Sequence, residues 1–334
     1  MSGSGVHLVS VGTWMPQEWM PAAEIGRRSG IPEEVIADRF GLDGKHVAGP
    51  DDHVSTMAAA AGAEALRRAG VAPEAVDVVG YFGSMGKDYL VWPVAAKVQQ
   101  LLGATDAWAL DMASVSCGAP VAMSVAAGLL AGDPTIDTVL LAGGCRESHL
   151  LDYANQRSRF MFSFGDGGAA ALLRRGGPGH EILAYRTITD GRFADDVAVY
   201  GGGTRHPASV ETVERRMHFL DVADPAGMKQ RLDPVSGANF LRVANEACRA
   251  AGVAPADMRL LAMLHTKRSF HEWIVGGLGI PRDRAVYLRR HGHMSGLDVL
   301  VGIDLHQDDL VQGDLVLCLA AGTGYTWSAM VIRW

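Results

Sequence analysis

Short apolar runs alternate with longer segments that carry one apolar face, and this alternation continues along nearly the whole chain. The apolar runs predict strands at 107–112, 136–143, 169–173, 314–321 and 325–332. Runs that are apolar throughout are typical of strands buried on both faces, and the longer segments predict helices that cover a sheet. Glycine-rich turns are expected at 165–168 and 322–324. The pattern therefore predicts an α/β fold.

One segment of the chain occurs twice. Residues 64–79 and 246–261 begin 182 residues apart and agree at eight of sixteen positions, and each predicts a helix, a glycine stop, a proline turn and a short strand. This combination is also a common stop signal, but an offset near half the chain length favours a duplicated fold. We predict two halves, 1–175 and 176–334. Within the second half, glycine, proline and charged residues at 176–237 predict insertion loops over the sheet.

Composition narrows the class of protein. The chain has 334 residues, of which 48% are hydrophobic and 20% charged, and this excludes a disordered or fibrous protein. Its formal charge of -7 argues against nucleic-acid binding, because no basic excess replaces counterions along a phosphate backbone. The four cysteines are widely spaced, so neither a disulfide framework nor a metal site is expected. No run approaches the roughly 20 apolar residues of a membrane span, and we expect a soluble cytoplasmic protein without a membrane partner.

The strongest chemical signal is a cysteine between a predicted strand and a long alanine-rich helix. The strand at 107–112 leads through small residues to Cys117, which would stand at the helix N-terminus. Unpaired N–H groups and the helix dipole at that position stabilise a thiolate and lower the pKa of the thiol. A buried structural cysteine is the alternative, but the order strand, cysteine, glycine, helix favours a nucleophile. Cys145, Cys248 and Cys318 lie inside apolar patterns and are expected to be structural.

These motifs resemble the thiolase superfamily, in particular the type III β-ketoacyl-[acyl-carrier-protein] synthases. The resemblance covers nearly the whole chain. It rests on the nucleophile segment at 111–118, the sequence FGDGGAAALL at 164–173 and the GTG loop at 322–324. It implies a five-layered αβαβα architecture with two pseudo-duplicated halves, and a homodimer. The repeat described above points independently to the same duplication.

The resemblance implies two catalytic histidines in the second half. His265 follows a predicted strand at the position of the family's catalytic histidine, although Thr-Lys-Arg replaces the family's Gln-Ala-Asn directly after it. His293 stands where the family has an asparagine. A neutral imidazole beside Cys117 would hold the thioester oxygen, stabilise an enolate or share the thiol proton. In addition, His293 can act as a base, which asparagine cannot.

The resemblance also implies the remaining site residues. The N–H groups of Cys117 and of the glycine loop at Gly324 would form an oxyanion hole. Phosphates of coenzyme A or phosphopantetheine would meet Arg39, Arg157, Arg159 and Arg268, unless these are ordinary solvated charges. The acyl chain would lie against Met85, Tyr89 and Trp92, which core packing explains equally well. The family's adenine-stacking tryptophan is Val35 here, and this makes a carrier-protein donor more credible.

The sequence therefore predicts an enzyme that transfers acyl groups through a Cys117 acyl-enzyme. Its donor would be acyl-coenzyme A or an acyl carrier protein, with no permanently bound cofactor. Among the possible reactions, the sequence slightly favours decarboxylative Claisen condensation with a malonyl thioester. This reaction would serve specialised polyketide-like or fatty-acid-like metabolism. The first alternative is transfer to a hydroxyl or amine acceptor. The others are a non-catalytic partner subunit of a ketosynthase and a thioesterase that admits water.

Overall fold

The computed structural model describes residues 5–334. Its strands are β1 (Val6–Trp14), β2 (Trp19–Pro21), β3 (Gly44–His46), β4 (Val78–Tyr81), β5 (Trp108–Asp111), β6 (Thr138–Arg146), β7 (Asp166–Arg175), β8 (His180–Thr189), β9 (Val197–Val199), β10 (Leu220–Val222), β11 (Leu260–Met263), β12 (Leu315–Gly322) and β13 (Thr326–Arg333). Its α-helices are α1 (Ala22–Ser29), α2 (Glu33–Val35), α3 (Val54–Ala69), α4 (Val94–Leu102), α5 (Gly118–Gly132), α6 (Val210–Glu214), α7 (Pro225–Ala251), α8 (Arg268–Leu278) and α9 (Asp298–Asp304).

The main sheet repeats one pairing pattern. Its strand order is β11-β12-β13-β8-β1-β7-β6-β4-β5. In the first half β4 and β6 are parallel, and the pairs β6–β7 and β7–β1 are antiparallel. In the second half β11 and β12 are parallel, and the pairs β12–β13 and β13–β8 are antiparallel. The halves join where His7 and Leu8 of β1 meet Glu181 and His180 of β8.

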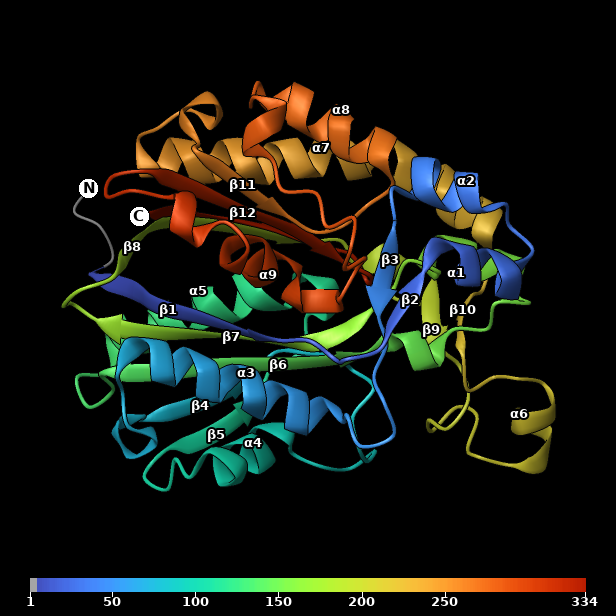
Figure 1. Cartoon of the computed structure of the whole chain (residues 1–334), viewed down its shortest axis with the longest axis horizontal. Helices are drawn as coiled ribbons and strands as arrows, with labels where there is room; N and C mark the ends of the chain where they lie inside the picture. Colours follow the sequence, from blue (N-terminus) through green and yellow to red (C-terminus); the bar gives the residue numbers. More distant parts are fainter. Residues whose placement is uncertain (1–4) are drawn as a thin grey trace.

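Helices cover both outer sides of the sheet and also lie between its two halves (Figure 1), which gives five layers. Helices α3 and α4 cover the first half of the sheet on its outer side, and α7 and α8 cover the second half. Helices α5 and α9 lie between the two halves and contact strands of both. The predicted α/β class, with its five layers and two similar halves, is confirmed.

The repeated segment forms equivalent elements in the two halves. Helix α3 ends at Gly70 with φ 63°, and α7 ends at Gly252 with φ 74°, so both stop on a glycine in the left-handed region. A short turn that begins at Pro73 or Pro255 follows each helix and leads into β4 or β11. The glycine and proline at these fixed offsets explain why the duplication was visible in the sequence.

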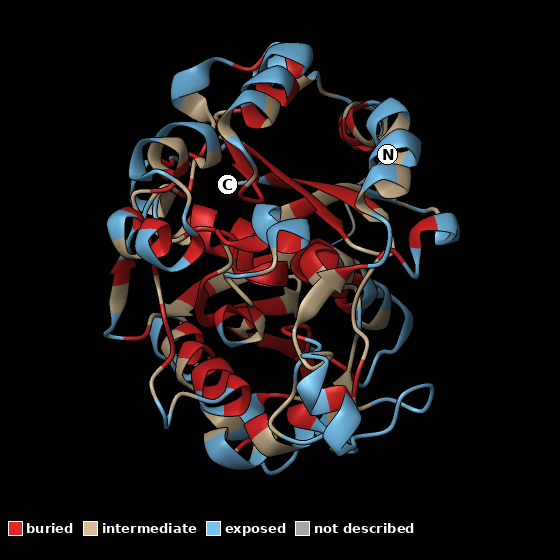
Figure 2. Ribbon diagram, turned by 90° about the vertical axis from the view of Figure 1, so that its right-hand side faces the viewer, coloured by how far each residue is buried: buried red, intermediate tan, exposed pale blue. Residues whose placement is uncertain are grey.

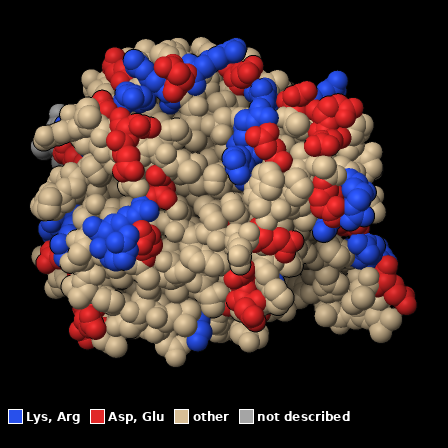
Figure 3. All heavy atoms as spheres, in the orientation of Figure 1, with Lys and Arg blue, Asp and Glu red and all other residues tan. Residues whose placement is uncertain are grey.

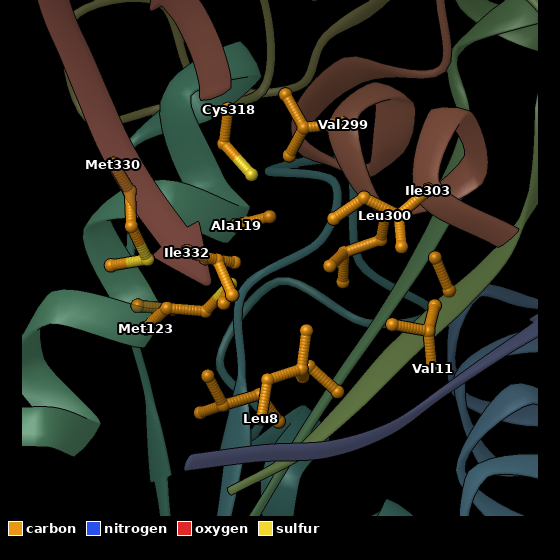
Figure 4. Packing of buried hydrophobic residues seen from close by; sticks show 14 of the residues in the cluster. Leu8, Val11, Ala119, Met123, Val299, Leu300, Ile303, Cys318, Met330 and Ile332 are labelled. Carbon is orange, nitrogen blue, oxygen red and sulfur yellow. The ribbon is translucent and has the colours of Figure 1, made fainter. Parts of the chain in front are cut away.

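The largest core lies where the inner helices meet. Ala119 and Met123 of α5 and Leu300 and Ile303 of α9 belong to one hydrophobic cluster (Figure 4), and all four are fully buried. Alanine lets backbones approach closely, which suits a helix enclosed between two sheets. Residues 115–132 are apolar and long enough to cross a membrane, but 56% of that window is buried inside the molecule, as in the core helix of a soluble protein.

Charged residues occupy the outer layers. Figure 2 shows that exposed positions concentrate on the peripheral helices and loops, whereas the central layers are buried. On the face drawn in Figure 3, acidic and basic side chains gather in small mixed clusters. Many exposed charges are paired within one helix, as Glu64 is with Arg67 at 2.7 Å. Such pairs contribute only about 0.2–1 kcal/mol each, so stability rests on the core.

Two local predictions need correction. The region 176–237 is not all insertion loop, because it contains β8 and the first half of α7. In β8 only Ile182 is buried, so the strand lacks the continuous apolar run that the prediction required, and Pro234 lies inside α7. The predicted turn at 165–168 is mostly the start of β7. Its Gly168 lets α3 approach, because a Cβ there would lie 2.2 Å from the carbonyl oxygen of Met57.

Candidate active site

A strained turn leads from β5 into α5. The turn spans Val115–Cys117, and Val115 adopts φ 47°, a left-handed conformation that a β-branched residue rarely takes. Such strain costs about 1–3 kcal/mol and persists only where the surroundings enforce it. The two residues that follow Val115 point in different directions. Ser116 lines a large cavity, and Cys117 enters the core.

The position of Cys117 contradicts the expectation of an open, activated thiol. The residue has no exposed surface and packs among core residues such as Ala119 and Met123. Its Sγ donates to the carbonyl oxygen of Ala320 at 3.6 Å. Burial raises the pKa of this thiol well above its usual value, because the thiolate would lose its hydration. Its backbone N–H, predicted to serve an oxyanion, donates to the carbonyl oxygen of Ser114 at 3.0 Å.

Ser116, His293 and Asp298 form a continuous hydrogen-bonded chain. The Ser116 Oγ lies 2.7 Å from Nε2 of His293, and Nδ1 of His293 lies 2.6 Å from Oδ2 of Asp298. The Asp298 carboxylate can only accept a hydrogen bond from Nδ1, so a neutral His293 carries its proton on Nδ1. Its Nε2 then accepts a hydrogen bond from the Ser116 hydroxyl. This is the geometry in which a histidine removes a serine proton while a carboxylate fixes its tautomer. The three side chains are at most 8% exposed.

Asp298 holds both predicted catalytic histidines. Besides His293, its Oδ2 accepts from the backbone N–H of His265 at 2.7 Å, and its Oδ1 accepts from the N–H of Met294 at 2.6 Å. Burial alone would lower the pKa of His293, but the charge and hydrogen bond of Asp298 outweigh it and hold the pKa above its usual value. Asp298 begins helix α9, so the helix sets the position of the carboxylate.

His265 lies in the same cavity in a different electrostatic setting. Its ring packs over Tyr287 with centroids 5.2 Å apart, and Nε2 lies 3.4 Å from the carbonyl oxygen of Gly41. Nδ1 is buried and has no hydrogen-bond partner among the described residues. Burial lowers the pKa of His265 to about 4, despite the opposing charge of Asp298, so the ring is neutral at pH 7.

A buried lysine supports the wall beside His293. The Nζ of Lys45 donates to the carbonyl oxygens of Phe162 and Phe164 at 2.9 and 2.6 Å. Between them, Ser163 accepts from the backbone N–H of His293 at 3.0 Å, and the Phe164 ring meets the imidazole edge to face at 4.8 Å. Complete burial lowers the pKa of Lys45 to about 7. The lysine therefore fixes the loop that orients the histidine.

The cavity has a volume of about 1010 Å³ and opens between α7, α8 and the segment before β3. Ser116, His265 and His293 form its buried part, and aromatic residues such as Phe240, Phe270 and Trp273 line the rest. Its exposed rim carries three cations, Arg39, Arg159 and Lys267, for which no ion pair is found within residues 5–334. Asp233 also lines the cavity and lies 3.9 Å from Lys229.

The predicted phosphate-binding arginines divide into two groups. Arg39 and Arg159 reach the rim as expected, whereas Arg157 is ion-paired with Asp221 and does not line the cavity. Arg268 lies 5.9 Å over the Tyr287 ring and is also absent from the wall. The neighbouring Lys267 takes the rim position instead, because the first turn of α8 directs Arg268 inward.

The predicted acyl-pocket residues lie elsewhere. Met85 and Tyr89 are 53% and 69% exposed, and neither they nor Trp92 line the cavity. Lys87 pairs with Asp111 at 2.5 Å, and Tyr89 packs on Trp92, so the loop turns outward as a unit. The apolar side chains of this loop did not show from the sequence alone whether the loop faces solvent or a pocket.

The glycine loop lies against the serine turn. A Cβ on Gly322 would come within 3.0 Å of the Ser116 nitrogen and 2.6 Å of the Ser114 carbonyl oxygen, so only glycine fits there. Gly324 follows in the turn between β12 and β13 with φ 112°. The loop thus lies against the turn before α5, where Gly322 adjoins the backbone amides of both Ser116 and Cys117.

Sequence reasoning missed Ser116, Asp298 and Lys45. The signal for Asp298 was present, because an acidic residue that follows a candidate histidine at a helix start can orient its ring. The signal for Ser116 was weaker, since serine and cysteine are adjacent and cysteine is intrinsically the better nucleophile. Among residues 5–334 no cluster of histidine, cysteine, aspartate and glutamate suits a metal ion.

Comparison with known proteins agrees with this architecture. The family model described as 3-oxoacyl-[acyl-carrier-protein] synthase III matches residues 110–191, and the model of its C-terminal part matches 248–334. The β-ketoacyl-[acyl-carrier-protein] synthase III of Rhodospirillum centenum is 30% identical over 336 residues, and that of Desulfitobacterium hafniense is 28% identical over 332; each match covers 98% of both chains. The crystal structure of the Thermus thermophilus synthase III superposes with a TM-score of 0.86 at 25% identity, covering 98% of this chain and 99% of that one.

Proposed function

We propose, since this chain belongs to the 3-oxoacyl-[acyl-carrier-protein] synthase III family, that Ser116 accepts an acyl group from a thioester and passes it to a hydroxyl or amine. The chain is an acyl-transferring enzyme with the thiolase-like fold of its relatives. The observation that carries the finer proposal is the Ser116–His293–Asp298 chain, with contacts of 2.7 and 2.6 Å. A serine needs such a base, because its hydroxyl is a weak nucleophile by itself.

The reaction has two balanced steps. In the first, Nε2 of His293 takes the Ser116 proton as Oγ attacks the thioester carbonyl; the carbon–sulfur bond breaks and the imidazolium returns the proton to the leaving thiolate. In the second, His293 takes a proton from the acceptor as the acceptor attacks the serine ester, and Oγ regains that proton. Gly322 lies against the Ser116 amide, so this amide and the Gly322–Gly324 loop would donate to the carbonyl oxygen as it gains negative charge.

The cationic rim supports a pantetheine-linked donor. Arg39, Arg159 and Lys267 are exposed around the cavity mouth, and guanidinium and ammonium groups bind phosphate well. A phosphopantetheine arm of coenzyme A or of a carrier protein would place its phosphates at this rim and its thioester near Ser116. We therefore propose these thioesters as donors and no permanently bound cofactor.

Decarboxylative condensation with a malonyl thioester is the second candidate. One observation favours it, namely that His265 and His293 line one cavity, as two groups facing an extender unit would. However, His293 is tied into a carboxylate–imidazole–serine chain and serves better as a base than as a donor to a carbonyl oxygen. Transfer to a protic acceptor therefore ranks first.

Single-turnover thiol release tests the proposal. Enzyme is mixed with excess acyl-coenzyme A, and the free thiol released in the first turnover is measured for the wild type, Ser116→Ala and Cys117→Ala. We expect Ser116→Ala to lose the burst and Cys117→Ala to keep it within about threefold. A burst that survives in Ser116→Ala but is lost in Cys117→Ala would restore the thiol as nucleophile.

The homodimer and the cytoplasmic location remain proposals. The loop that contains Tyr89, Leu90 and Val91 exposes these side chains by 69%, 84% and 100%. Adjacent apolar side chains of this kind are typical of protein–protein contacts, which supports a contact between two copies. Sedimentation of the wild type against a Leu90→Ser, Val91→Ser variant tests it, with dimer expected for the first and monomer for the second.

A further inference from the structure

The acyl-enzyme state changes what the cavity offers to a second substrate. In the free enzyme the Ser116 hydroxyl donates to Nε2 of His293. Once Oγ carries an acyl group it has no proton to donate, so this nitrogen is left with a free lone pair. Nδ1 of His293 still donates to Asp298. After acylation Nε2 of His293 therefore presents a hydrogen-bond acceptor, and not an N–H donor, to the cavity.

His265 also presents a hydrogen-bond acceptor. Its Nε2 faces the carbonyl oxygen of Gly41 at 3.4 Å, and because a carbonyl oxygen can only accept, that nitrogen carries the ring proton. Nδ1 is then the basic nitrogen, and it is buried without a partner in a residue only 5% exposed that lines the cavity. A buried polar atom without a partner has lost its hydration without replacement, so a ligand that supplies a hydrogen there is favoured.

We propose that the acceptor substrate carries two donor hydrogens, one for His293 and one for Nδ1 of His265, at or directly beside its attacking atom. This rests on the proposed serine acyl-enzyme and names its second substrate class: a primary amine, or a hydroxyl with a neighbouring O–H or N–H. A malonyl thioester carbonyl fits poorly, because it needs hydrogen donors where the two rings offer lone pairs.

The chemistry balances without any further reagent. The attacking nitrogen or oxygen forms a bond to the acyl carbon, the bond from that carbon to Oγ of Ser116 breaks, and one acceptor hydrogen passes through His293 to Oγ. The second hydrogen stays on the acceptor and is hydrogen-bonded to Nδ1 of His265 throughout. His265 thus orients the acceptor and takes no proton, in keeping with a pKa lowered by burial to about 4.

Deacylation of isolated acyl-enzyme tests this inference. Wild-type acyl-enzyme is mixed with methoxyamine, which has two N–H hydrogens, or N,O-dimethylhydroxylamine, which has one; both are uncharged at neutral pH. In a second arm, 1,2-ethanediol is compared with ethanol. In at least one of the two pairs, we expect the compound with two donor hydrogens to react about tenfold faster, because it can form the additional buried hydrogen bond. The arm in which it does so identifies the acceptor as amine or diol.

Variants separate the role of His265 from general damage. His265→Phe should reduce the preference to within about twofold, whereas His265→Gln, which keeps an acceptor oxygen, should retain part of it. His271→Phe is the matched control, because His271 is also buried, donates to a backbone carbonyl at 3.0 Å and packs on Tyr287, but does not line the cavity.

The outcomes distinguish the two proposals. Equal rates for both members of both pairs, or a preference that survives in His265→Phe, would overturn the inference. So would carbon dioxide release with a carbon–carbon product when the acyl-enzyme meets a malonyl thioester. In these cases the Ser116 acyl-enzyme itself still stands. Failure to form any adduct on Ser116 would instead overturn the proposed function.

Discussion

Two adjacent residues, Ser116 and Cys117, face different environments because one residue before them adopts an unusual conformation. Val115 has φ 47°, and the next side chain enters the cavity while the following one enters the core. The reactivity of a side chain here depends on which of these environments it meets. The hydroxyl has a base 2.7 Å away, whereas burial raises the pKa of the thiol far above neutrality.

The raised pKa of His293 predicts the pH dependence of the enzyme. The base must be neutral, so kcat/KM falls as pH drops through the pKa of His293, which Asp298 holds above the ordinary value of about 6.5. Asp298→Asn removes the charge that raises this pKa, so the acidic limb should move to lower pH. The plateau should fall by about 10²–10⁴-fold, since the tautomer is no longer fixed.

The pH profile has a control in the same helix. Asp304 ends α9 and pairs with Arg68, away from the cavity, so Asp304→Asn should leave the limb in place. An unchanged limb in Asp298→Asn would show that another group is the base.

At the residue scale the sequence pointed to Cys117, which is the neighbour of Ser116, the nucleophile proposed from the structure. The order strand, small residues, helix is visible in the sequence, and so are His265 and His293. The direction of each side chain was not, because it depends on the backbone angle of Val115, a residue whose type favours a different conformation. Lys45 gave no signal either, since its role arises from carbonyl oxygens more than a hundred positions away.

Two similar turns meet at the inner ends of helices α5 and α9. Val115 precedes α5 with φ 47°, and Ser295 precedes α9 with φ 52°. A Cβ on Gly296 would lie 2.9 Å from the Val115 carbonyl oxygen, so these turns are in direct contact. The two turns therefore hold Ser116 and His293 at a fixed separation, with one residue contributed by each half.

The contact between the glycine loop and the serine turn gives a prediction about Gly322. In Gly322→Ala the new methyl would meet backbone atoms of Ser114, Ser116 and Cys117 at 2.6–3.0 Å, so one segment must move. We expect kcat to fall by about 10²-fold, because small displacements at a reacting centre are costly. The measurement is single-turnover acylation together with a thermal melt.

Gly128→Ala provides the matched control. Gly128 lies at an exposed position of α5, the helix that follows the serine turn, and a Cβ there meets nothing within 4 Å. Alanine should stabilise the helix by about 0.5–1 kcal/mol and leave the rate unchanged. Full acylation activity in Gly322→Ala would mean that the loop does not position the serine.

Elements with a strong apolar run were predictable, and those without one were not. Strand β6 and strands β12 and β13 were placed within a few residues, since each is buried almost throughout. Strand β8 was missed, because it has little continuous apolar character although it lies between β13 and β1, where the two halves join. Its pairing with β13 and β1, over long sequence separations, decides its conformation.

The whole molecule has an interlocked core. The largest buried cluster combines Leu8 and Met123 from the first half with Leu300 and Met330 from the second. Although the sequence predicts two similar halves, neither half covers its inner helix alone. The duplicated pattern was readable from one repeat, but the shared core depends on how α5 and α9 pack between the halves.

This shared core predicts a single cooperative unfolding transition. Leu300→Ala removes a fully buried side chain of α9 and should cost about 2–5 kcal/mol. Amide hydrogen exchange should accelerate together in β7 of the first half and β12 of the second. Leu305→Ala, at a position 49% exposed just after α9, should change stability by less than about 0.5 kcal/mol. Faster exchange confined to the second half in Leu300→Ala would show that the halves unfold independently.

Mapping the trapped acyl group tests the central claim most directly. Enzyme quenched in acid after a brief exposure to acyl-coenzyme A is digested, and the peptide that contains both Ser116 and Cys117 is fragmented in a mass spectrometer. The account predicts the added acyl mass on Ser116, as an oxygen ester. The same mass on Cys117, as a thioester, would contradict it.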